Sequence, residues 1–133
     1  MQFYEKTIIV GEKDLDELDH VNNVRYVQWI QDISKEHWRA RATKEILESV
    51  VWVVMNHNIS YKSAAILNDT ILVRTYIEKS RGAISIRIVE MYNAKTKTLL
   101  VRSSTEWCLL NAKSFKPTRI SQDIKEIFLH ETR

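Results

Sequence analysis

Residues 12–19 place five carboxylates in eight positions, and a histidine and two asparagines follow directly in the string EKDLDELDHVNN. Carboxylates and histidine commonly act as general acids, general bases or nucleophiles. A segment predicted to be helical comes next, and the free N–H groups of a helix N-terminus can hold a developing negative charge. The pattern therefore suits a catalytic base held over a helix end. A solvated acidic loop that favours the helix dipole is the alternative.

A helix is predicted from Asn23 to about Arg41, because apolar side chains recur there at helical spacing. The face expected to be buried carries Tyr26, Trp29, Ile30, Ile33 and His37. Asn22 or Asn23 is a suitable N-cap, since an asparagine side chain can accept from first-turn N–H groups. This helix would fix the position of the acidic segment before it.

The remainder of the chain is predicted to be nearly all strand, because apolar and polar residues alternate along it. The expected strands are 2–10, 49–63, 68–80, 81–93 and 97–112, with tight turns at 81–82 and 93–96 and a short final helix at 121–130 after Pro117. A first strand, a long apolar-faced helix and four further strands indicate an α+β fold. Its sheet should wrap the helix and leave an edge that requires a partner.

Composition excludes several classes of protein. A chain of 133 residues suits one domain, and we detect no repeat or linker. The chain has no apolar run of membrane-spanning length, and the N-terminal segment, interrupted by Glu5, does not resemble a signal peptide. The single cysteine, Cys108, excludes an intrachain disulfide and suits a buried thiol in a cytoplasmic protein. A net charge of +3 without a Lys/Arg-rich run suits an anionic ligand and argues against nucleic acid.

The segment DLDELDHVNNVRYVQWIQD (14–32) resembles the signature of hotdog-fold thioesterases of the 4-hydroxybenzoyl-CoA thioesterase and acyl-ACP thioesterase lineage. That signature has an Asp-x-Asp pair before His-Val-Asn-Asn and a tyrosine at the start of the central helix. The matching residues here are Asp14, Asp16, His20, Val21, Asn22, Asn23 and Tyr26. The strand order and the stretches NDTILVRTYI and AKSFKPTRIS are also similar to the family. The resemblance implies a single hotdog domain over 1–133, an antiparallel sheet wrapped around a long central helix.

The resemblance also implies a function in fatty acid metabolism, the hydrolysis of an acyl-CoA or acyl-ACP thioester without a metal or a redox cofactor. In the family pattern Asp16 is the general base or the nucleophile, the amide of Asn23 holds the thioester oxygen, and His20 lines the site or orients its neighbours. The active sites of such a homodimer or homotetramer lie between subunits. Acyl chain length and the choice between CoA and carrier protein stay open.

Three positions depart from the family pattern. Asp19 stands where many members have glycine, Leu18 replaces an asparagine of the plant enzymes, and Ala64 lies near the position of their glutamate. Two other functions therefore remain open: a non-catalytic acyl-thioester binding protein, and a hydroxyacyl dehydratase, although the differently placed histidine and acid of the dehydratases are not found.

Simpler structural roles are expected for the other polar residues. Glu12, Glu17 and Asp19 suit a solvated loop, and Asp14 suits either a supporting role or a cap. His57 and His130 are expected to be structural, and Tyr26, Trp29 and Ile33 to be core residues in preference to the wall of an acyl pocket. A nucleotide phosphate could be reached by Arg74, Arg81, Arg87 or Arg102, and the sequence selects none of them.

Overall fold

The computed structural model describes residues 2–129, so His130 and the end of the predicted final helix lie outside the described residues. The elements in chain order are β1 (Tyr4–Ile9), the 3-10 turn η1 (Glu12–Asp14), α1 (Asn23–Arg41), α2 (Lys44–Ser49), β2 (Val50–Tyr61), β3 (Thr70–Arg81), β4 (Ile84–Asn93), β5 (Leu99–Asn111) and α3 (Gln122–Ile127). The predicted helix is confirmed at both ends, and every predicted strand is present. The turn η1 and the helix α2 were not predicted.

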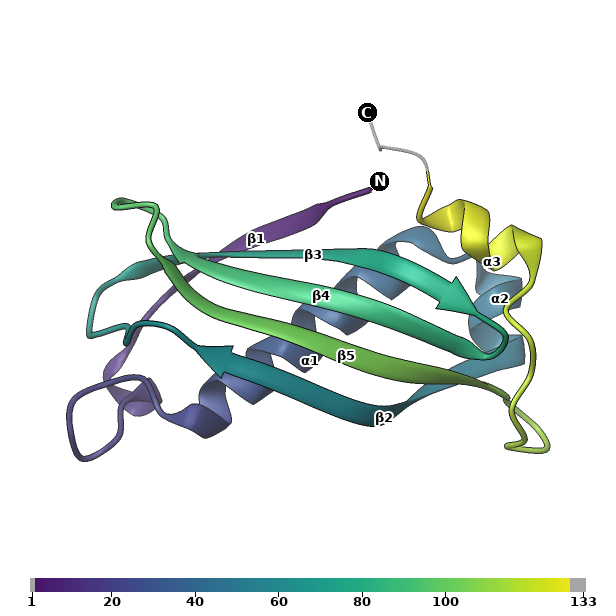
Figure 1. Ribbon diagram of the computed structural model, residues 1–133, viewed down its shortest axis with the longest axis horizontal. Helices are drawn as coiled ribbons and strands as arrows, with labels where there is room; N and C mark the ends of the chain where they lie inside the picture. The colour runs from purple at the N-terminus through teal and green to yellow at the C-terminus, as the bar shows by residue number, and fades with distance from the viewer. Residues whose placement is uncertain (1, 130–133) are drawn as a thin grey trace.

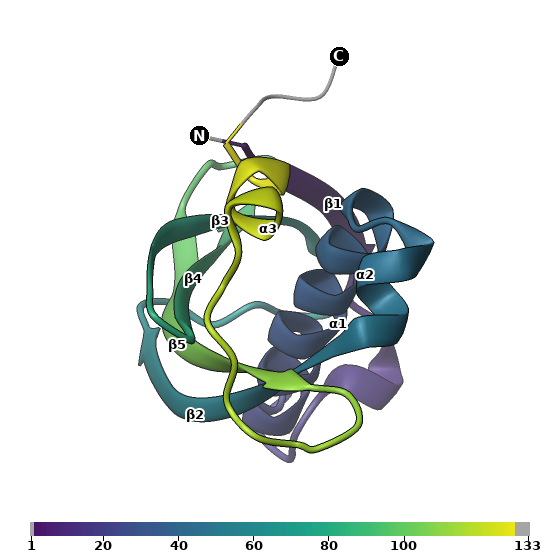
Figure 2. The ribbon, with the colours of Figure 1, turned by 90° about the vertical axis from the view of Figure 1, so that its right-hand side faces the viewer.

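The strands form one antiparallel sheet in the order β1-β3-β4-β5-β2. The sheet curves around α1, which lies along its concave side (Figure 1, Figure 2). Ile30 and Ile33 of α1 are fully buried there with Ile71, Val73 and Val101 of the sheet. The α+β hotdog architecture is therefore confirmed, and the apolar stripe of α1 is the reason that the sheet closes over it.

The inward face of β4 carries polar residues along half of its length. Val89 and Met91 join the core around α1, and Arg87 on the same face contacts His37 of α1. The alternation along this strand was predicted, but the isoleucine face, which includes the fully buried Ile88, does not belong to the core cluster around α1. Alternation defines two faces of a strand, and only the packing of the helix decides which one lies inside.

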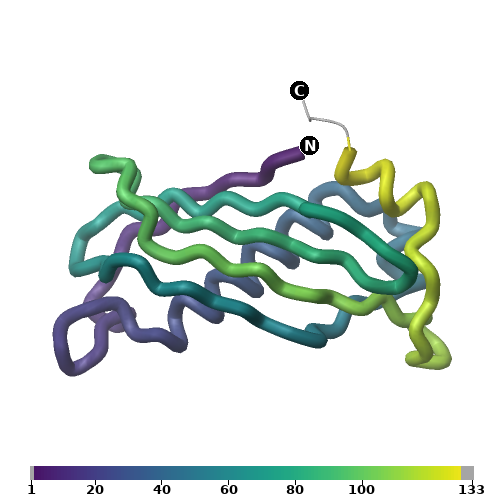
Figure 3. The backbone as a smooth tube through the Cα atoms, viewed as in Figure 1, coloured from purple at the N-terminus to yellow at the C-terminus, as the bar shows by residue number. Residues whose placement is uncertain are grey.

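The strands run the length of the molecule, and the connections gather at its two ends (Figure 3). At one end Gly82 takes a φ of +60° in the turn between β3 and β4, where a side chain would be strained. At the other end Asn93 Oδ1 accepts from the backbone N–H groups of Lys95 and Thr96. Both predicted turns are confirmed.

Within the described residues, none of the helices has the length and apolarity needed to cross a membrane.

Candidate active site

Asp14 is a buried anchor between the acidic loop and the central helix. Its side chain is 5% exposed, and its Oδ1 accepts from Arg25 Nε at 2.8 Å. Its Oδ2 accepts from the N–H of Gly11 at 2.9 Å, and its carbonyl accepts from the N–H of Asn22 at 2.8 Å. Oδ1 and the carbonyl therefore tie the loop to the start of α1, and Oδ2 ties it to Gly11 before the 3-10 turn, which agrees with a supporting role.

Asp16 lies two residues farther on and keeps one oxygen available. Its Oδ1 accepts from the N–H groups of Leu18 at 2.8 Å and His20 at 3.2 Å. Its own N–H donates to the carbonyl of His20 at 2.7 Å, so residues 16–20 close a tight hairpin. Its Oδ2 has no hydrogen-bond partner among residues 2–129, and the residue is half-buried. A carboxylate oriented through one oxygen, with the other free, suits a base or a nucleophile.

At the N-terminus of α1, which follows this hairpin in the chain, one backbone amide is capped and one has no acceptor among residues 2–129. Asn22 is the N-cap, and its Oδ1 accepts from the N–H of Val24 at 3.0 Å. The N–H of Asn23 has no acceptor in the described part of the chain. The side-chain oxygen of Asn23 accepts from the hydroxyl of Tyr61, which lies at the end of β2. The free N–H at the positive end of the helix dipole is a suitable oxyanion donor.

Neighbouring strands and loops fix the hairpin in place. Val21 N–H donates to the carbonyl of Ala65 at 3.0 Å, and His20 pairs in a β-bridge with Ile66. Ala65 N–H donates in turn to the hydroxyl of Tyr26 at 3.1 Å. Burial raises the pKa of Tyr26, so that its hydroxyl stays neutral and can accept this bond. Tyr26 thus holds the segment at Ala65 and Ile66, and this segment in turn holds the hairpin.

The structure brings the backbone of His20 to Asp16, but not its ring. The side chain of His20 is exposed and forms no hydrogen bond with any described residue.

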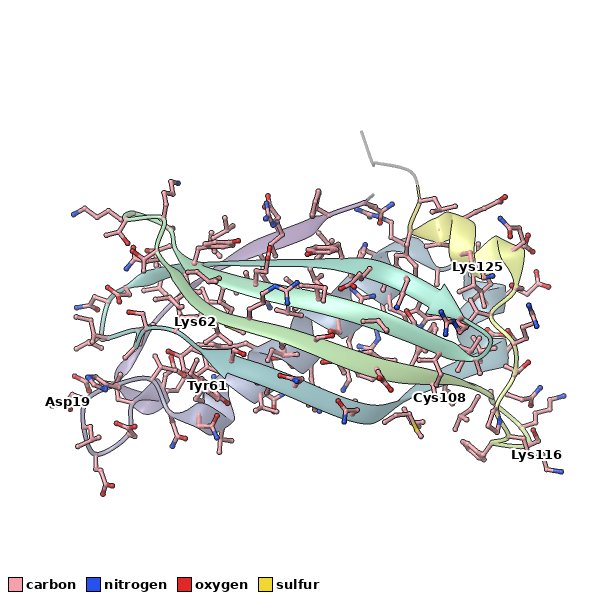
Figure 4. All side chains as sticks on the ribbon, viewed as in Figure 1. Asp19, Tyr61, Lys62, Cys108, Lys116 and Lys125 are labelled. Carbon is pink, nitrogen blue, oxygen red and sulfur yellow. The ribbon has the colours of Figure 1, made fainter. Side chains whose placement is uncertain are left out.

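Asp19 takes a φ of +60°, a conformation that glycine adopts without strain and that aspartate tolerates better than most residues. The glycine that the family pattern has at this place would adopt the same backbone conformation without strain. Figure 4 shows Asp19 and Tyr61 at the same end of the molecule.

A cavity of about 460 Å³ lies at the other end of α1, between that helix, α2, α3 and the sheet, and none of Asp16, His20 or Asn23 lines it. We call it the distal cavity. Arg87 lines it and is 5% exposed, so this arginine cannot meet a nucleotide phosphate on the protein surface. Its Nη1 donates to His37 Nδ1 at 2.9 Å and to Thr75 Oγ1 at 3.0 Å. The buried network was not predicted, because its members are 12 and 50 residues apart.

Several buried or half-buried residues away from the hairpin have the structural roles predicted for them. Tyr26, Trp29 and Ile33 are buried core residues, as predicted. His57 is half-buried and pairs with Thr105, Nδ1 to Oγ1 at 2.8 Å, which fits a structural role, and burial lowers its pKa. Cys108 is a buried free thiol. Tyr61 and Arg25 contact Asn23 and Asp14 and were not predicted from the sequence, since neither forms a motif with the residue it contacts.

Among known proteins, the long-chain acyl-CoA thioesterase FadM of Escherichia coli strain K12 is 26% identical over 73 residues, which are 51% of this chain and 53% of that protein. The chain thus aligns with about half the length of this relative. The crystal structure of the probable thioesterase YbaW from E. coli superposes with a TM-score of 0.84 at 19% identity, over 92% of this chain and 94% of that one. The 12:0-ACP thioesterase from Umbellularia californica gives a TM-score of 0.82 at 16% identity, over 96% and 51%.

The match to a family covers nearly the whole described chain. Residues 2–128 match the acyl-ACP thioesterase N-terminal domain, and this range contains the hairpin, the N-terminus of α1 and the full sheet. The superpositions support the same hotdog fold. The chain therefore belongs to the family of acyl-ACP thioesterase N-terminal domains.

Proposed function

We propose that this protein is an acyl thioesterase, that residues 1–133 form one hotdog domain, and that Asp16 and the N–H of Asn23 are its catalytic groups. The single observation that carries the proposal is the juxtaposition at the start of α1. There a carboxylate with one free oxygen lies in the hairpin 16–20, six residues before the N-cap Asn22, and the N–H of Asn23 has no acceptor among residues 2–129. Family membership and the similarity to proteins described as acyl-CoA and acyl-ACP thioesterases support it.

In the proposed reaction the thioester carbonyl oxygen accepts a hydrogen bond from the N–H of Asn23, which stabilises the oxyanion as it forms. Asp16 Oδ2 takes a proton from a water molecule, and the water oxygen attacks the carbonyl carbon. The C–S bond then breaks, and the leaving thiolate takes the proton that Asp16 received from water. The second course is direct attack by Asp16, which breaks the C–S bond, releases the thiolate and leaves an anhydride that water then hydrolyses to the free acid and Asp16. In either course His20, whose side chain is exposed, would border the substrate.

We further propose that two copies of the chain meet at the free edge of β2. This edge strand has 12 residues and exposes the apolar side chains of Val53 and Met55, at 38% and 61%. Such an edge invites pairing with a second chain. The opposite edge, β1, has only six residues and carries Glu5 and Lys6, which discourages pairing. A partner at β2 would approach Tyr61 and hence Asn23, which agrees with the expected homodimer or homotetramer with sites between subunits.

The test is release of free thiol from a panel of acyl-CoAs and acyl-ACPs of different chain length. Wild type should show an optimum chain length and a preferred carrier. Asp16→Asn should lower kcat by about 10²–10⁴-fold, the usual contribution of a general base. Asp19→Asn, an exposed carboxylate in the same hairpin, is the matched control and should keep its activity. Equal turnover by wild type and Asp16→Asn would contradict the proposal.

The oxyanion donor has its own test, because proline is well tolerated at the first position of a helix. Asn23→Pro deletes the N–H, and Asn23→Ala keeps it while removing the same side-chain amide. Asn22 has φ −65° and ψ 138°, a conformation that a following proline permits. The proline variant should lose about 10²–10³-fold in kcat relative to the alanine variant. If no form of the protein releases thiol and all bind acyl-CoA equally, the protein is a binding module.

A further inference from the structure

The distal cavity lies at the end of α1 opposite the candidate active site. Its apolar walls are formed by Trp38, Trp52, Trp107, Val50, Ile77 and Phe128. Ser34 of α1, on the same wall, lies 11 residues beyond Asn23, which is roughly 16 Å along the helix. A volume of about 460 Å³ is within the range of small-molecule sites. The cavity is thus large enough for a ligand, and the proposed reaction does not use it.

Arg87 brings a buried positive charge to this cavity without a negative partner. Its two neighbours, His37 and Thr75, both accept from Nη1, and no carboxylate lies within 4.0 Å of it among residues 2–129. A guanidinium has five N–H groups, so three on Nε and Nη2 remain without a partner in that part of the chain. An unpaired buried charge is expensive, and a ligand that supplied the anion would remove the penalty.

The imidazole beside Arg87 does not neutralise this positive charge, and the ring of Phe128, whose centroid is 5.5 Å from Cζ, adds a cation–π contact but no anion. Because His37 Nδ1 accepts from Arg87, the ring proton belongs on Nε2, which lies 2.6 Å from Gln2 Oε1. Burial, with the charges of Arg87 and Arg41, lowers the pKa of His37 to about 3. Burial also lowers the pKa of Arg87, to about 9, so the guanidinium stays protonated at neutral pH. The inner wall therefore carries one net positive charge.

The other polar groups of the cavity are also suited to an anion. Trp107 Nε1 is buried without a hydrogen-bond partner, and an indole N–H can only donate. The remaining charged residues of the lining, Lys35 and Arg39, are both cationic and both exposed, so they stand toward solvent. Among residues 2–129, the lining contains no aspartate or glutamate. Apolar walls with unused donors and only positive charges describe a site for an amphiphilic anion.

We propose that the distal cavity binds an amphiphilic carboxylate, with its carboxylate group on Arg87 and its hydrocarbon body along the tryptophan-lined walls. A carboxylate matches the planar guanidinium through two parallel N–H···O bonds and carries a single charge, equal to that of the buried arginine. A phosphate monoester would bring a larger charge between apolar walls. Two sources share this chemistry: a free fatty carboxylate, and an acyl thioester whose distal end carries a second carboxylate.

The first experiment compares decanoate with 1-decanol and methyl decanoate, below their micelle-forming concentrations, by calorimetry and by tryptophan fluorescence. Wild type should bind decanoate at least tenfold more tightly than either uncharged probe, as expected for a charge-assisted pair of hydrogen bonds. Arg87→Met should abolish this preference and still bind decanol. The matched control is Arg102→Met, which replaces an exposed arginine of β5 and should retain the preference for decanoate over the uncharged probes. Equal affinity of wild type for the three probes would overturn the proposal, even if Arg87→Met did not fold.

A second variant tests the location of the ligand. Ser34→Leu places a larger apolar side chain into the cavity without removing a charge. This variant should lower the affinity of the protein for decanoate, 1-decanol and methyl decanoate by at least tenfold. Unchanged binding of decanoate by Ser34→Leu would place the ligand elsewhere and contradict the assignment. The quenching of tryptophan fluorescence by a brominated fatty carboxylate should be lost in the same variant, because three of the four tryptophans line the cavity.

The two sources are separated by binding to the Asp16→Asn variant, which removes any dependence on turnover. If the ligand is the distal end of a thioester, an ω-carboxyacyl-CoA should bind at least tenfold more tightly than the unsubstituted acyl-CoA, and Arg87→Met should erase the difference. If the ligand is a free fatty carboxylate, decanoate binds and the two thioesters do not differ. Decanoate binding by Asp16→Asn should equal that of wild type, so the failure of the proposed hydrolysis would not be mistaken for a failure of this site.

Discussion

The guanidinium of Arg25, in the first turn of α1, donates from Nε to the buried Oδ1 of Asp14 at 2.8 Å. This bond joins the acidic loop to the helix that follows it, directly beside Asp16. Asp14 is almost fully buried, whereas Arg25 is 35% exposed. The pair therefore acts as a clamp that sets the distance between the free carboxylate and the N-terminus of α1.

Removing this clamp should destabilise the protein. Asp14→Asn should lower the free energy of unfolding by about 1.5–3 kcal/mol, the usual worth of hydrogen bonds to a charged group. Urea unfolding measures the change, and a double-mutant cycle with Arg25→Met should give a coupling energy of about 1 kcal/mol or more. The exposed Asp19→Asn serves as the comparison and should change stability by less than about 0.5 kcal/mol. Additive effects of Asp14→Asn and Arg25→Met would show that the two residues do not act together.

The positive φ of Asp19 predicts an ordered response to substitution. Asp19→Val should destabilise the protein by about 1–2 kcal/mol, because a β-branched side chain is strained at φ +60°. Asp19→Gly should leave stability equal or slightly higher, since glycine adopts this conformation freely. Thermal unfolding of the two variants beside wild type measures both effects. A glycine variant less stable than the valine variant would contradict the proposed backbone constraint.

The buried imidazole of His37 predicts a pH dependence of stability. Its pKa falls to about 3 in the folded protein, against about 6.5 in an unfolded chain, so the unfolded state binds more protons between these values. The contribution of neutral His37 is therefore complete above pH 6.5 and is lost as the pH falls toward 3. The slope should approach about 1.4 kcal/mol per pH unit within that window.

Urea unfolding at pH 4, 5, 6 and 7 tests this expectation. His37→Gln keeps a hydrogen-bonding side chain and should flatten the profile. The exposed His20→Gln should leave the wild-type slope in place. The prediction fails if His37→Gln loses as much stability as wild type between pH 6 and pH 4.

The edge strand β2 predicts the behaviour of the protein in solution. Wild type should sediment as a dimer or a higher multiple of one. Met55→Lys should shift it toward the monomer, because a lysine on an edge strand opposes pairing with a second chain. Ile9→Lys, at the other edge and 70% exposed, is the matched control and should leave the assembly unchanged. Sedimentation velocity distinguishes these cases, and a monomeric wild type would exclude the proposed assembly.

Local features of the fold were readable from the sequence because their partners are near in the chain. Helical spacing predicted α1 from Asn23 to about Arg41, and the preference of asparagine for the N-cap limited the cap to Asn22 or Asn23, of which Asn22 accepts from the N–H of Val24. The turn at Gly82 follows from the same short-range chemistry. The short helix α2 escaped prediction, since six residues carry too little periodicity to distinguish a helix from a strand.

The motif of Asp16, His20 and Asn23 was equally visible as a string, but its geometry was not. Only the folded chain brings Tyr61 to Asn23, 38 residues away, and leaves the ring of His20 exposed, without a hydrogen bond to Asp16. Only packing decided that Arg87 faces inward with His37 while the isoleucines of β4 face the other way. Sequence periodicity specifies that a strand has two different faces. The curvature of the sheet around α1 determines which of them becomes the interior, and this depends on contacts between residues far apart in the chain.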